Sequence, residues 1–337
     1  MSGGWSKWEN DGVCSKDCGG GVQIQKRICT VSGLFECEGE NTTIVTCNEF
    51  ECPDCICGIA KRNEKIVNGR ETEVGEYPWQ VTLMACTNGL YSQDCRFFCG
   101  GTLISDRWIL TAAHCTDKEE HDEPSEIVVL LGAHDISKES RQNRNEYLMR
   151  KVISIVPHPQ YNQETINYDF SLLKIKNPID WTSAYDVRPI CLPMANSKSK
   201  NYVGQDSIVT GWGAVTWQGA SSDVLLESKG LKVISNEECN SAKYGYNKTH
   251  HITEQMLCAT SKFNEDSCQG DSGGPLITSL NKSGIRPDEN YELIGVVSWG
   301  IGCGWKNYPD VYASVLMALP WITEKTKEDW LTCPRKK

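Results

Sequence analysis

Between residues 66 and about 326, hydrophobic residues gather in short runs rich in β-branched and aromatic side chains, with turn residues between the runs. Runs of this length and spacing are typical of the strands of an all-β barrel or sandwich. The clearest runs are residues 79–83, 127–131, 170–175, 207–210 and 293–297. The pattern from residue 315 to about 329 predicts one closing helix, with Pro320 near its first turn.

The first 57 residues have a different pattern, with eight cysteines and almost no long apolar run. A segment that buries so little apolar area cannot fold alone, so we expect disulfides to stabilise it. The change of pattern divides the chain into a front module (1–54), a linker (55–65), a β-rich domain (66–326) and a tail (327–337). The linker contains the polar stretch 61–65, which is typical of sites that proteases cut.

The 18 cysteines among 337 residues predict an oxidising compartment, because so many free thiols would not persist in the cytosol. N-glycosylation sequons at Asn41, Asn247 and Asn281 agree with secretion. Residues 1–5 have no basic start and no apolar stretch, so no signal peptide is predicted. The chain is then a mature form, a trimmed form or one with an incomplete upstream region. No run of about 18 apolar residues occurs, so we expect no transmembrane segment.

The net charge of −10 excludes nucleic acid as a partner, because phosphate binding needs a basic face. The acidic balance favours cationic protein substrates, or reflects solubility alone.

Three segments contain residue types that suit nucleophilic catalysis. Residues 110–115 are Leu-Thr-Ala-Ala-His-Cys, residues 167–173 are Asn-Tyr-Asp-Phe-Ser-Leu-Leu, and residues 266–275 are Asp-Ser-Cys-Gln-Gly-Asp-Ser-Gly-Gly-Pro. In the order His, Asp, Ser, they resemble the chymotrypsin/trypsin family of serine proteases over roughly residues 66–326. The resemblance implies a double β-barrel with a C-terminal helix, and an endopeptidase that acts on protein substrates.

The chemistry explains why these residue types occur together. A serine hydroxyl is a weak nucleophile near neutral pH, so a base must take its proton. The resemblance assigns Ser272 as the nucleophile, His114 as the base and Asp169 as the group that orients the imidazole. It also implies that the N–H groups of Gly270 and Ser272 bind the developing oxyanion.

The sequence Ile-Val-Asn-Gly at residues 66–69 follows Lys65 directly. In the family, a cut before such a motif frees an α-amine that pairs with the Asp preceding the nucleophile, here Ile66 with Asp271. The chain is therefore expected to be a zymogen that another trypsin-like protease, or the enzyme itself, activates. Inhibitors of the serpin or Kunitz type are the expected regulators.

The resemblance also predicts the substrate preference. Asp266 occupies the position of the carboxylate at the bottom of the primary pocket, which implies cleavage after Lys or Arg. Ser298, Trp299 and Gly300 match the segment that lines this pocket and binds the substrate backbone. Asp310 departs from the pattern, because the family usually has Gly on that part of the wall. A second carboxylate there would shorten the pocket and couple to Asp266, which leaves the ratio of Arg to Lys cleavage open.

No cofactor or metal is expected. Ala133 stands near the position where the family's calcium loop has Glu, with Glu146 as the one carboxylate left. Pro309 stands where sodium-activated relatives have an aromatic residue.

The resemblance implies most of the disulfides in the β-rich domain. The implied pairs are Cys99–Cys115, Cys239–Cys258 and Cys268–Cys303, with Cys86–Cys95 as an added local bridge. Cys191 is the family position that tethers the propeptide, through Cys57 or Cys55. With Cys333, these four cysteines allow three connectivities, of which we favour Cys55–Cys333 beside Cys57–Cys191. Ser207 and Thr278 stand where one further family disulfide would be.

The front module resembles a thrombospondin type-1 repeat over about residues 5–52. The matching segments are Trp-Ser-Lys-Trp at 5–8, Cys-Ser-Lys-Asp-Cys-Gly-Gly-Gly at 14–21 and Lys-Arg-Ile-Cys at 26–29. The resemblance implies stacked layers of Trp and Arg, with Arg27 between Trp5 and Trp8. It also implies the pairs Cys14–Cys47, Cys18–Cys52 and Cys29–Cys37, and a matrix, glycan or protein ligand. The alternative is another kind of small disulfide module.

Two other functions compete with an active protease. The chain could be a non-catalytic protein on a protease fold that acts through its thrombospondin-like module. In a third interpretation, the front module performs the biological function and proteolysis is incidental. The complete set of catalytic residue types favours the endopeptidase.

Overall fold

The structure is a computed structural model that describes part of the chain. The described residues are 4–12, 14, 21–30, 37–47, 57–61, 70–87, 94–117, 126–137, 147–181, 187–194, 202–214, 219–241, 243–244, 251–261, 271–280, 290–300 and 308–327.

Six antiparallel strands close the first barrel, in the order β10-β7-β6-β5-β8-β9. They are β5 (Gln80–Cys86), β6 (Cys95–Leu103), β7 (Trp108–Thr111), β8 (Glu126–Leu131), β9 (Leu148–Pro157) and β10 (Ser171–Ile175). All four residues of β7 and most residues of β5 are buried, because these strands lie between the barrel interior and the neighbouring layers. This explains why their sequences are nearly continuous hydrophobic runs.

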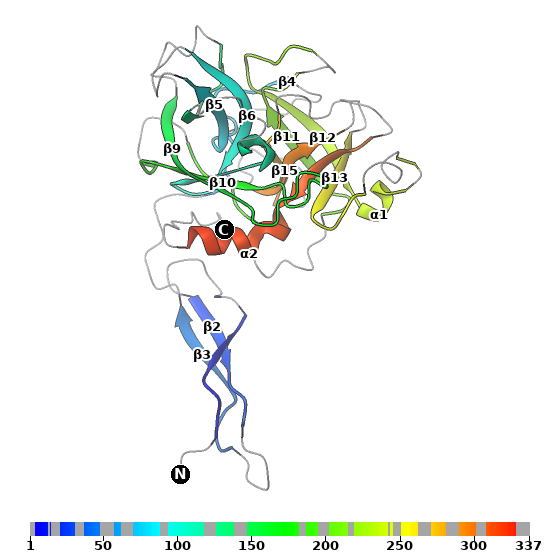
Figure 1. Cartoon of the computed structure of the whole chain (residues 1–337). Helices are drawn as coiled ribbons and strands as arrows, with labels where there is room; N and C mark the ends of the chain where they lie inside the picture. The colour runs from blue at the N-terminus through cyan, green and yellow to red at the C-terminus, as the bar shows by residue number, and fades with distance from the viewer. Residues whose placement is uncertain are drawn as a thin grey trace.

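The second barrel has the strand order β11-β14-β15-β16-β13-β12, and a pairing between β11 and β12 closes it. Its strands are β11 (Asp206–Gly211), β12 (Leu226–Ile234), β13 (Met256–Ser261), β14 (Pro275–Ser279), β15 (Tyr291–Trp299) and β16 (Asp310–Ser314), and β4 (Arg70–Glu71) adds to β12. The two barrels stand side by side with a helix below them (Figure 1). The all-β double barrel predicted from the sequence is confirmed, and so are its five clearest strands.

The closing helix α2 (Val315–Thr326) follows directly on β16. Its buried side chains recur at the spacing of one helix face, which packs below the barrels (Figure 1). The prediction that Pro320 lies near the first turn is wrong, since the helix starts at Val315 and Pro320 is its sixth residue. Pro320 is exposed there, so the ring points away from the core that stabilises the other face. Among the described residues, no helix is long and apolar enough to cross a membrane.

Two short helical turns lie in the described part of the domain. They are η1 (His114–Thr116), after β7, and α1 (Asn236–Cys239), after β12. The Ser235 side chain caps α1 by accepting a hydrogen bond from the N–H of Glu238 at 3.0 Å.

The front module is a three-stranded sheet in the order β1-β2-β3, which extends away from the barrels beyond α2 (Figure 1). Its strands are β1 (Glu9–Asp11), β2 (Gly21–Lys26) and β3 (Thr42–Cys47). Val22, Ile24 and Ile44 remain exposed, so the sheet has little apolar core of its own.

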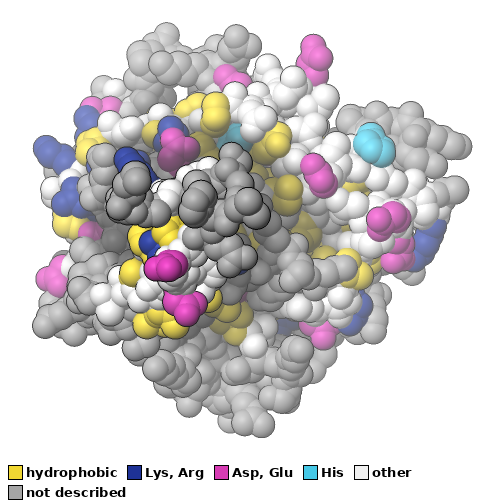
Figure 2. Space-filling model, turned by 90° about the horizontal axis from the view of Figure 1, so that it is seen from below, with side chains coloured by type: hydrophobic (Ala, Val, Ile, Leu, Met, Phe, Trp, Pro, Cys, Tyr) yellow, Lys and Arg dark blue, Asp and Glu magenta, His cyan; other side chains and the backbone are white. Residues whose placement is uncertain are grey.

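On the face of the whole molecule seen from below, hydrophobic side chains of the described residues are interspersed with charged ones (Figure 2).

Stacked side chains take the place of that core. The guanidinium carbon of Arg27 lies 4.3 Å from the ring centroid of Trp5 and 4.4 Å from that of Trp8. Its Nε donates to the Glu40 carbonyl at 2.9 Å, which fixes the plane of the guanidinium between the rings. The placement of Arg27 between Trp5 and Trp8, predicted from the sequence, is confirmed.

Six of the expected disulfides form among the described residues. They are Cys14–Cys47, Cys29–Cys37, Cys57–Cys191, Cys86–Cys95, Cys99–Cys115 and Cys239–Cys258. Cys191 therefore pairs with Cys57 rather than Cys55. The expected pairs Cys18–Cys52, Cys268–Cys303 and Cys55–Cys333 lie outside the described residues.

Ser207 and Thr278, which replace two cysteines of the family, are direct neighbours across the β11–β14 pairing. Both side chains are buried, and each hydroxyl finds its own acceptor. Ser207 donates to the Leu231 carbonyl at 3.0 Å, and Thr278 donates to the Asp206 carbonyl at 2.9 Å. Two separate hydrogen bonds thus stand where a covalent bond would be.

His158 fixes α2 to the first barrel. Its ring stacks on Tyr168 with centroids 4.6 Å apart and lies 4.8 Å from the Trp321 ring of α2. The Nδ1 atom accepts a hydrogen bond from the backbone N–H of Gln160 at 3.2 Å, so the neutral ring fits this environment. Burial lowers the pKa of His158, because it disfavours the imidazolium.

This lowered pKa predicts how folding stability depends on pH. As the pH falls through about 6.5, an unfolded histidine binds a proton more readily than folded His158, so acidification favours unfolding. A His158→Asn variant keeps an acceptor for Gln160 and should lose less stability than the wild type between pH 7.5 and pH 5. Thermal unfolding at both pH values measures this, and equal losses in the two proteins would contradict it.

Candidate active site

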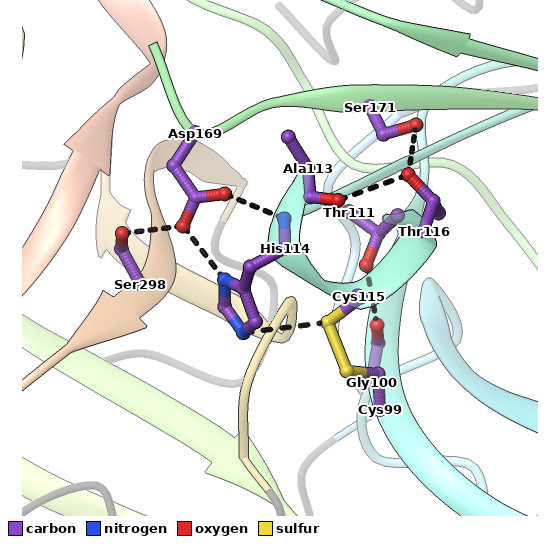
Figure 3. Close-up of a disulfide and its surroundings, with 10 residues drawn as sticks. All are labelled: Cys99, Gly100, Thr111, Ala113, His114, Cys115, Thr116, Asp169, Ser171 and Ser298. Carbon is purple, nitrogen blue, oxygen red and sulfur yellow. Dashed lines mark hydrogen bonds and ion pairs between the residues drawn. A yellow bond between two sulfur atoms is a disulfide. The ribbon is translucent and has the colours of Figure 1, made fainter. Parts of the chain in front are cut away.

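His114 lies on the short turn η1, directly after β7 of the first barrel. Ala112 and Ala113 before it are buried, and their small side chains let the turn pack closely on the barrel. The Cys99–Cys115 disulfide ties the turn to β6 (Figure 3). The imidazole itself is 21% exposed, so it is anchored on one side and accessible on the other.

Asp169 lies two residues before β10 and is fully buried. Its Oδ1 accepts the backbone N–H of His114 at 2.9 Å, and its Oδ2 lies 2.8 Å from Nδ1 of the same residue. Oδ2 also accepts the Ser298 hydroxyl at 2.5 Å, from β15 of the second barrel (Figure 3). A buried carboxylate is stable only when donors surround it, and these three donors supply that.

This arrangement assigns the two ring nitrogens of His114 different roles. A carboxylate accepts hydrogen bonds, so Nδ1 holds the proton of the neutral ring and Nε2 is the nitrogen with the basic lone pair. The Nε2 atom lies 3.7 Å from the sulfur of Cys115. His114, oriented by Asp169, can therefore act as a general base through Nε2.

Cys99, His114 and Cys115 also present potential metal-binding atoms within 4.8 Å of one another. Both sulfurs belong to one disulfide, however, and a metal ion binds the thiolate form of cysteine. This group is therefore an imidazole beside a disulfide and no metal site.

Ser272 lies on a tight turn before β14 that contacts the first barrel. Its carbonyl accepts the N–H of Gly100 on β6 at 2.8 Å. The next residue, Gly273, has φ of +78°, and a Cβ there would overlap the Thr111 hydroxyl and lie 2.6 Å from the Gly100 carbonyl. Only glycine fits both the backbone angle and the space, which explains the glycine after Ser272.

The same close approach brings the Ser272 turn beside the His114 turn. A Cβ on Gly273 would lie 3.2 Å from the sulfur of Cys115, the residue after His114. His114 and Asp169 of the predicted triad therefore belong to the first barrel, and Ser272 belongs to a turn of the second barrel whose backbone contacts the first. Asp169 and His114 are joined directly, while Ser272 reaches them through the backbone contact with Gly100.

Asp271 is held by two glycines, one at the end of β11 and one just after it. The N–H of Gly213 donates to Asp271 Oδ1 at 2.8 Å. A Cβ on Gly213 or Gly211 would overlap the carboxylate, so the side chain fills a space that only glycines leave open. Its expected partner, Ile66, lies outside the described residues, together with Lys65.

Part of the predicted substrate pocket can be located. Ser298 and Trp299 end strand β15, and Gly300 follows them exposed. Asp310 begins the adjacent strand β16 and is buried, and the Tyr312 hydroxyl lies 3.4 Å from its Oδ2. A carboxylate therefore lies beside the strand that carries the predicted substrate-binding residues. Asp266 and Gly270 lie outside the described residues.

The sequence did not indicate that Ser298 binds Asp169. The two residues are 129 positions apart and lie in different barrels, so neither a motif nor a periodicity connects them. The hydrogen bond between the Thr116 and Ser171 hydroxyls, at 3.0 Å within the first barrel, was also missed, because no motif connects these two residues.

Comparison with known proteins supports the same interpretation. The family model described as "Trypsin" matches residues 66–322, so the front module lies outside the match. The chain is similar to the serine proteinase stubble of Drosophila melanogaster, with 34% identity over 275 residues, 80% of this chain and 32% of that protein. Human transmembrane protease serine 11B is 37% identical over 266 residues, 78% of this chain and 56% of the relative.

Bovine coagulation factor XI is 35% identical over 275 residues, which are 81% of this chain and 40% of that protein. The matched part thus spans between 32% and 56% of the length of these three relatives.

An Asp169→Asn exchange tests the arrangement. The amide keeps the shape of the side chain but replaces one carboxylate oxygen by an NH2 group. The Nδ1–H group of His114 thereby loses the charged acceptor that it has in the wild type. We expect kcat for peptide hydrolysis to fall by about 10⁴. Asp106→Asn, at another buried aspartate of the first barrel, is the matched control and should keep kcat. A loss below tenfold in a folded Asp169→Asn protein would contradict the role of the carboxylate.

Proposed function

Because the chain belongs to the trypsin family of serine proteases, we propose that it is the zymogen of a secreted endopeptidase that cleaves proteins after Lys or Arg. The observation that most supports activity is the buried Asp169 carboxylate, which binds Nδ1 of His114 at 2.8 Å. This contact prepares Nε2 to accept a proton, and a non-catalytic protein would have no need of it.

In the proposed reaction, Ser272 Oγ attacks the scissile carbonyl carbon while its proton moves to Nε2 of His114. Asp169 stabilises the imidazolium, and the N–H groups of Gly270 and Ser272 bind the oxyanion. The tetrahedral intermediate collapses as His114 gives the proton to the leaving amine. A water molecule then attacks the acyl-enzyme by the same steps and regenerates the Ser272 hydroxyl.

Cleavage between Lys65 and Ile66 is the proposed activation step. Asp271 is adjacent in sequence to Ser272, and its carboxylate lies in the space that Gly211 and Gly213 leave open. A new α-amine on Ile66 that pairs with Asp271 would order the turn that carries Ser272. Because a buried ion pair is stable only with both charges present, the intact chain would lack this order.

The Cys57–Cys191 disulfide joins residues on either side of the proposed cut. Cleavage at Lys65 would therefore leave the front module, which ends near residue 54, covalently attached to the protease domain of residues 66–326. The many disulfides support an extracellular location, where such bonds persist.

We assign the Lys or Arg preference to Asp266 and a change in the depth of its pocket to Asp310. A carboxylate deep in the pocket selects a cationic side chain, because an apolar one would leave the charge unpaired. Asp310 lies on the strand next to Ser298 and Trp299, where a second carboxylate shortens the pocket and couples to the first.

The front module is proposed to be a thrombospondin type-1 repeat that targets the protease to matrix, a glycan or a protein partner. Its support is the Arg27 guanidinium stacked between Trp5 and Trp8, together with the Cys14–Cys47 and Cys29–Cys37 disulfides. A trypsin-like activator and inhibitors of the serpin or Kunitz type complete the proposed partners.

A Lys65→Gln variant tests the activation step. Trypsin should convert the wild type into an enzyme that hydrolyses a Lys or Arg peptide substrate, while the variant, verified uncut by gel, should show less than a hundredth of that rate. Lys61→Gln changes an exposed lysine of the same linker and should activate normally. Full activity in uncut Lys65→Gln would disprove activation at this bond.

The pocket assignment is tested with matched peptides that differ only in Arg, Lys or Leu before the scissile bond. The activated wild type should cut the Arg and Lys peptides and leave the Leu peptide intact. Asp310→Gly should raise kcat/KM for the cationic peptides and change the ratio between them, because it lengthens the pocket. Cleavage of the Leu peptide alone would contradict the trypsin-like preference.

A further inference from the structure

A second hydrogen bond runs beside the one between His114 and Asp169. Thr116 Oγ1 lies 3.0 Å from Ser171 Oγ, and each partner is two residues beyond a member of the first pair (Figure 3). The first and the last residue of η1 are thus both joined to the stretch from Asp169 to Ser171, where β10 begins. One contact holds the imidazole of His114, and the other holds the last residue of its turn.

Ser171 is fully buried, and Thr116 is half-buried. The Thr116 hydroxyl also lies 3.1 Å from the Ala113 carbonyl, which is the residue before His114. A hydroxyl has one proton and two lone pairs, so while Thr116 donates to Ala113, Ser171 can donate to Thr116. The three groups then form one chain of hydrogen bonds, and such chains strengthen their members.

Neighbouring strands and the barrel core hold the segment that carries Ser171. Ser171 pairs with Thr111 of β7 on one side and with Pro157 of β9 on the other. Phe170, between Asp169 and Ser171, is buried in the core cluster of the first barrel. Because Asp169 and Ser171 cannot move independently, a contact from Thr116 to Ser171 also fixes the His114 turn relative to the Asp169 carboxylate.

We propose that Ser171 is a positioning residue for the reaction, which acts through Thr116 to hold the His114 imidazole in line with Asp169. This inference rests on the proposed function, since it assigns a residue to the orientation of the proposed base. Ser171 touches neither His114 nor the substrate in this account, so its effect should appear in kcat and leave KM unchanged.

The experiment compares kcat and KM of activated variants, with active sites counted by a covalent serine-directed inhibitor. Ser171→Ala and Thr116→Val should each lower kcat about three- to tenfold, the effect of one neutral hydrogen bond. The double variant should be no slower than the slower single variant, because both changes break the same contact. Thr116→Ser keeps the hydroxyl and should retain kcat within twofold.

Ser207→Ala is the matched control. It removes a serine hydroxyl that is equally buried, at 1% exposure, but whose bond to the Leu231 carbonyl lies in the second barrel. Its melting temperature should fall about as much as that of Ser171→Ala, while its kcat should equal that of the wild type. The difference between the two variants separates a positioning role from a purely structural one.

Two results would overturn the inference. If Ser171→Ala keeps the wild-type kcat, or if the Ser171 and Thr116 effects simply multiply in the double variant, Ser171 does not act through Thr116. These outcomes leave the proposed function intact, because the wild type is still an active protease. If the activated wild type itself hydrolyses no peptide, both the proposed function and this inference fail.

Discussion

The active site depends on one buried carboxylate. Asp169 has no solvent exposure, and it is stable there because three donors from two barrels reach its oxygens. Two of these donors belong to His114, so satisfying the carboxylate also fixes the imidazole and its tautomer. The third is the Ser298 hydroxyl of the second barrel, so the same charge helps to hold the two barrels in register. Stability and chemistry thus rest on the same hydrogen bonds.

The barrels contribute different parts of the site, and glycines allow those parts to meet. The first barrel provides the proposed base, His114, and the Asp169 carboxylate on short segments beside buried strands. The second provides Ser272 on a turn whose Gly273 packs against Thr111 and Gly100 of the first barrel. The adjacent Asp271 fills the space left by Gly211 and Gly213. Asp271 is adjacent to Ser272, so a change in its surroundings would reach the proposed nucleophile within one residue, as the proposed activation requires.

Much of the fold and the site could be predicted because their signals are local. Short β-rich runs indicated the strands, and short motifs pointed to His114 and Asp169, whose side chains lie in contact. The stacking of Arg27 between Trp5 and Trp8 was expected from the resemblance to a thrombospondin repeat. Long-range side-chain contacts could not be predicted, since nothing in the sequence near Ser298 or Ser171 refers to its partner. The position of Pro320 within α2 was missed because burial of the opposite helix face outweighs the lost hydrogen bond.

Covalent labelling with a fluorophosphonate examines the base and the nucleophile together, since the reagent reacts with a serine hydroxyl only when a nearby base activates it. The chain would be cut with trypsin, labelled and digested, and mass spectrometry would locate the modified residue. The account predicts one label, on Ser272, which the intact chain and a His114→Ala variant both lack. An unlabelled Ser272 in the cut wild type, or equally fast labelling of His114→Ala, would contradict it.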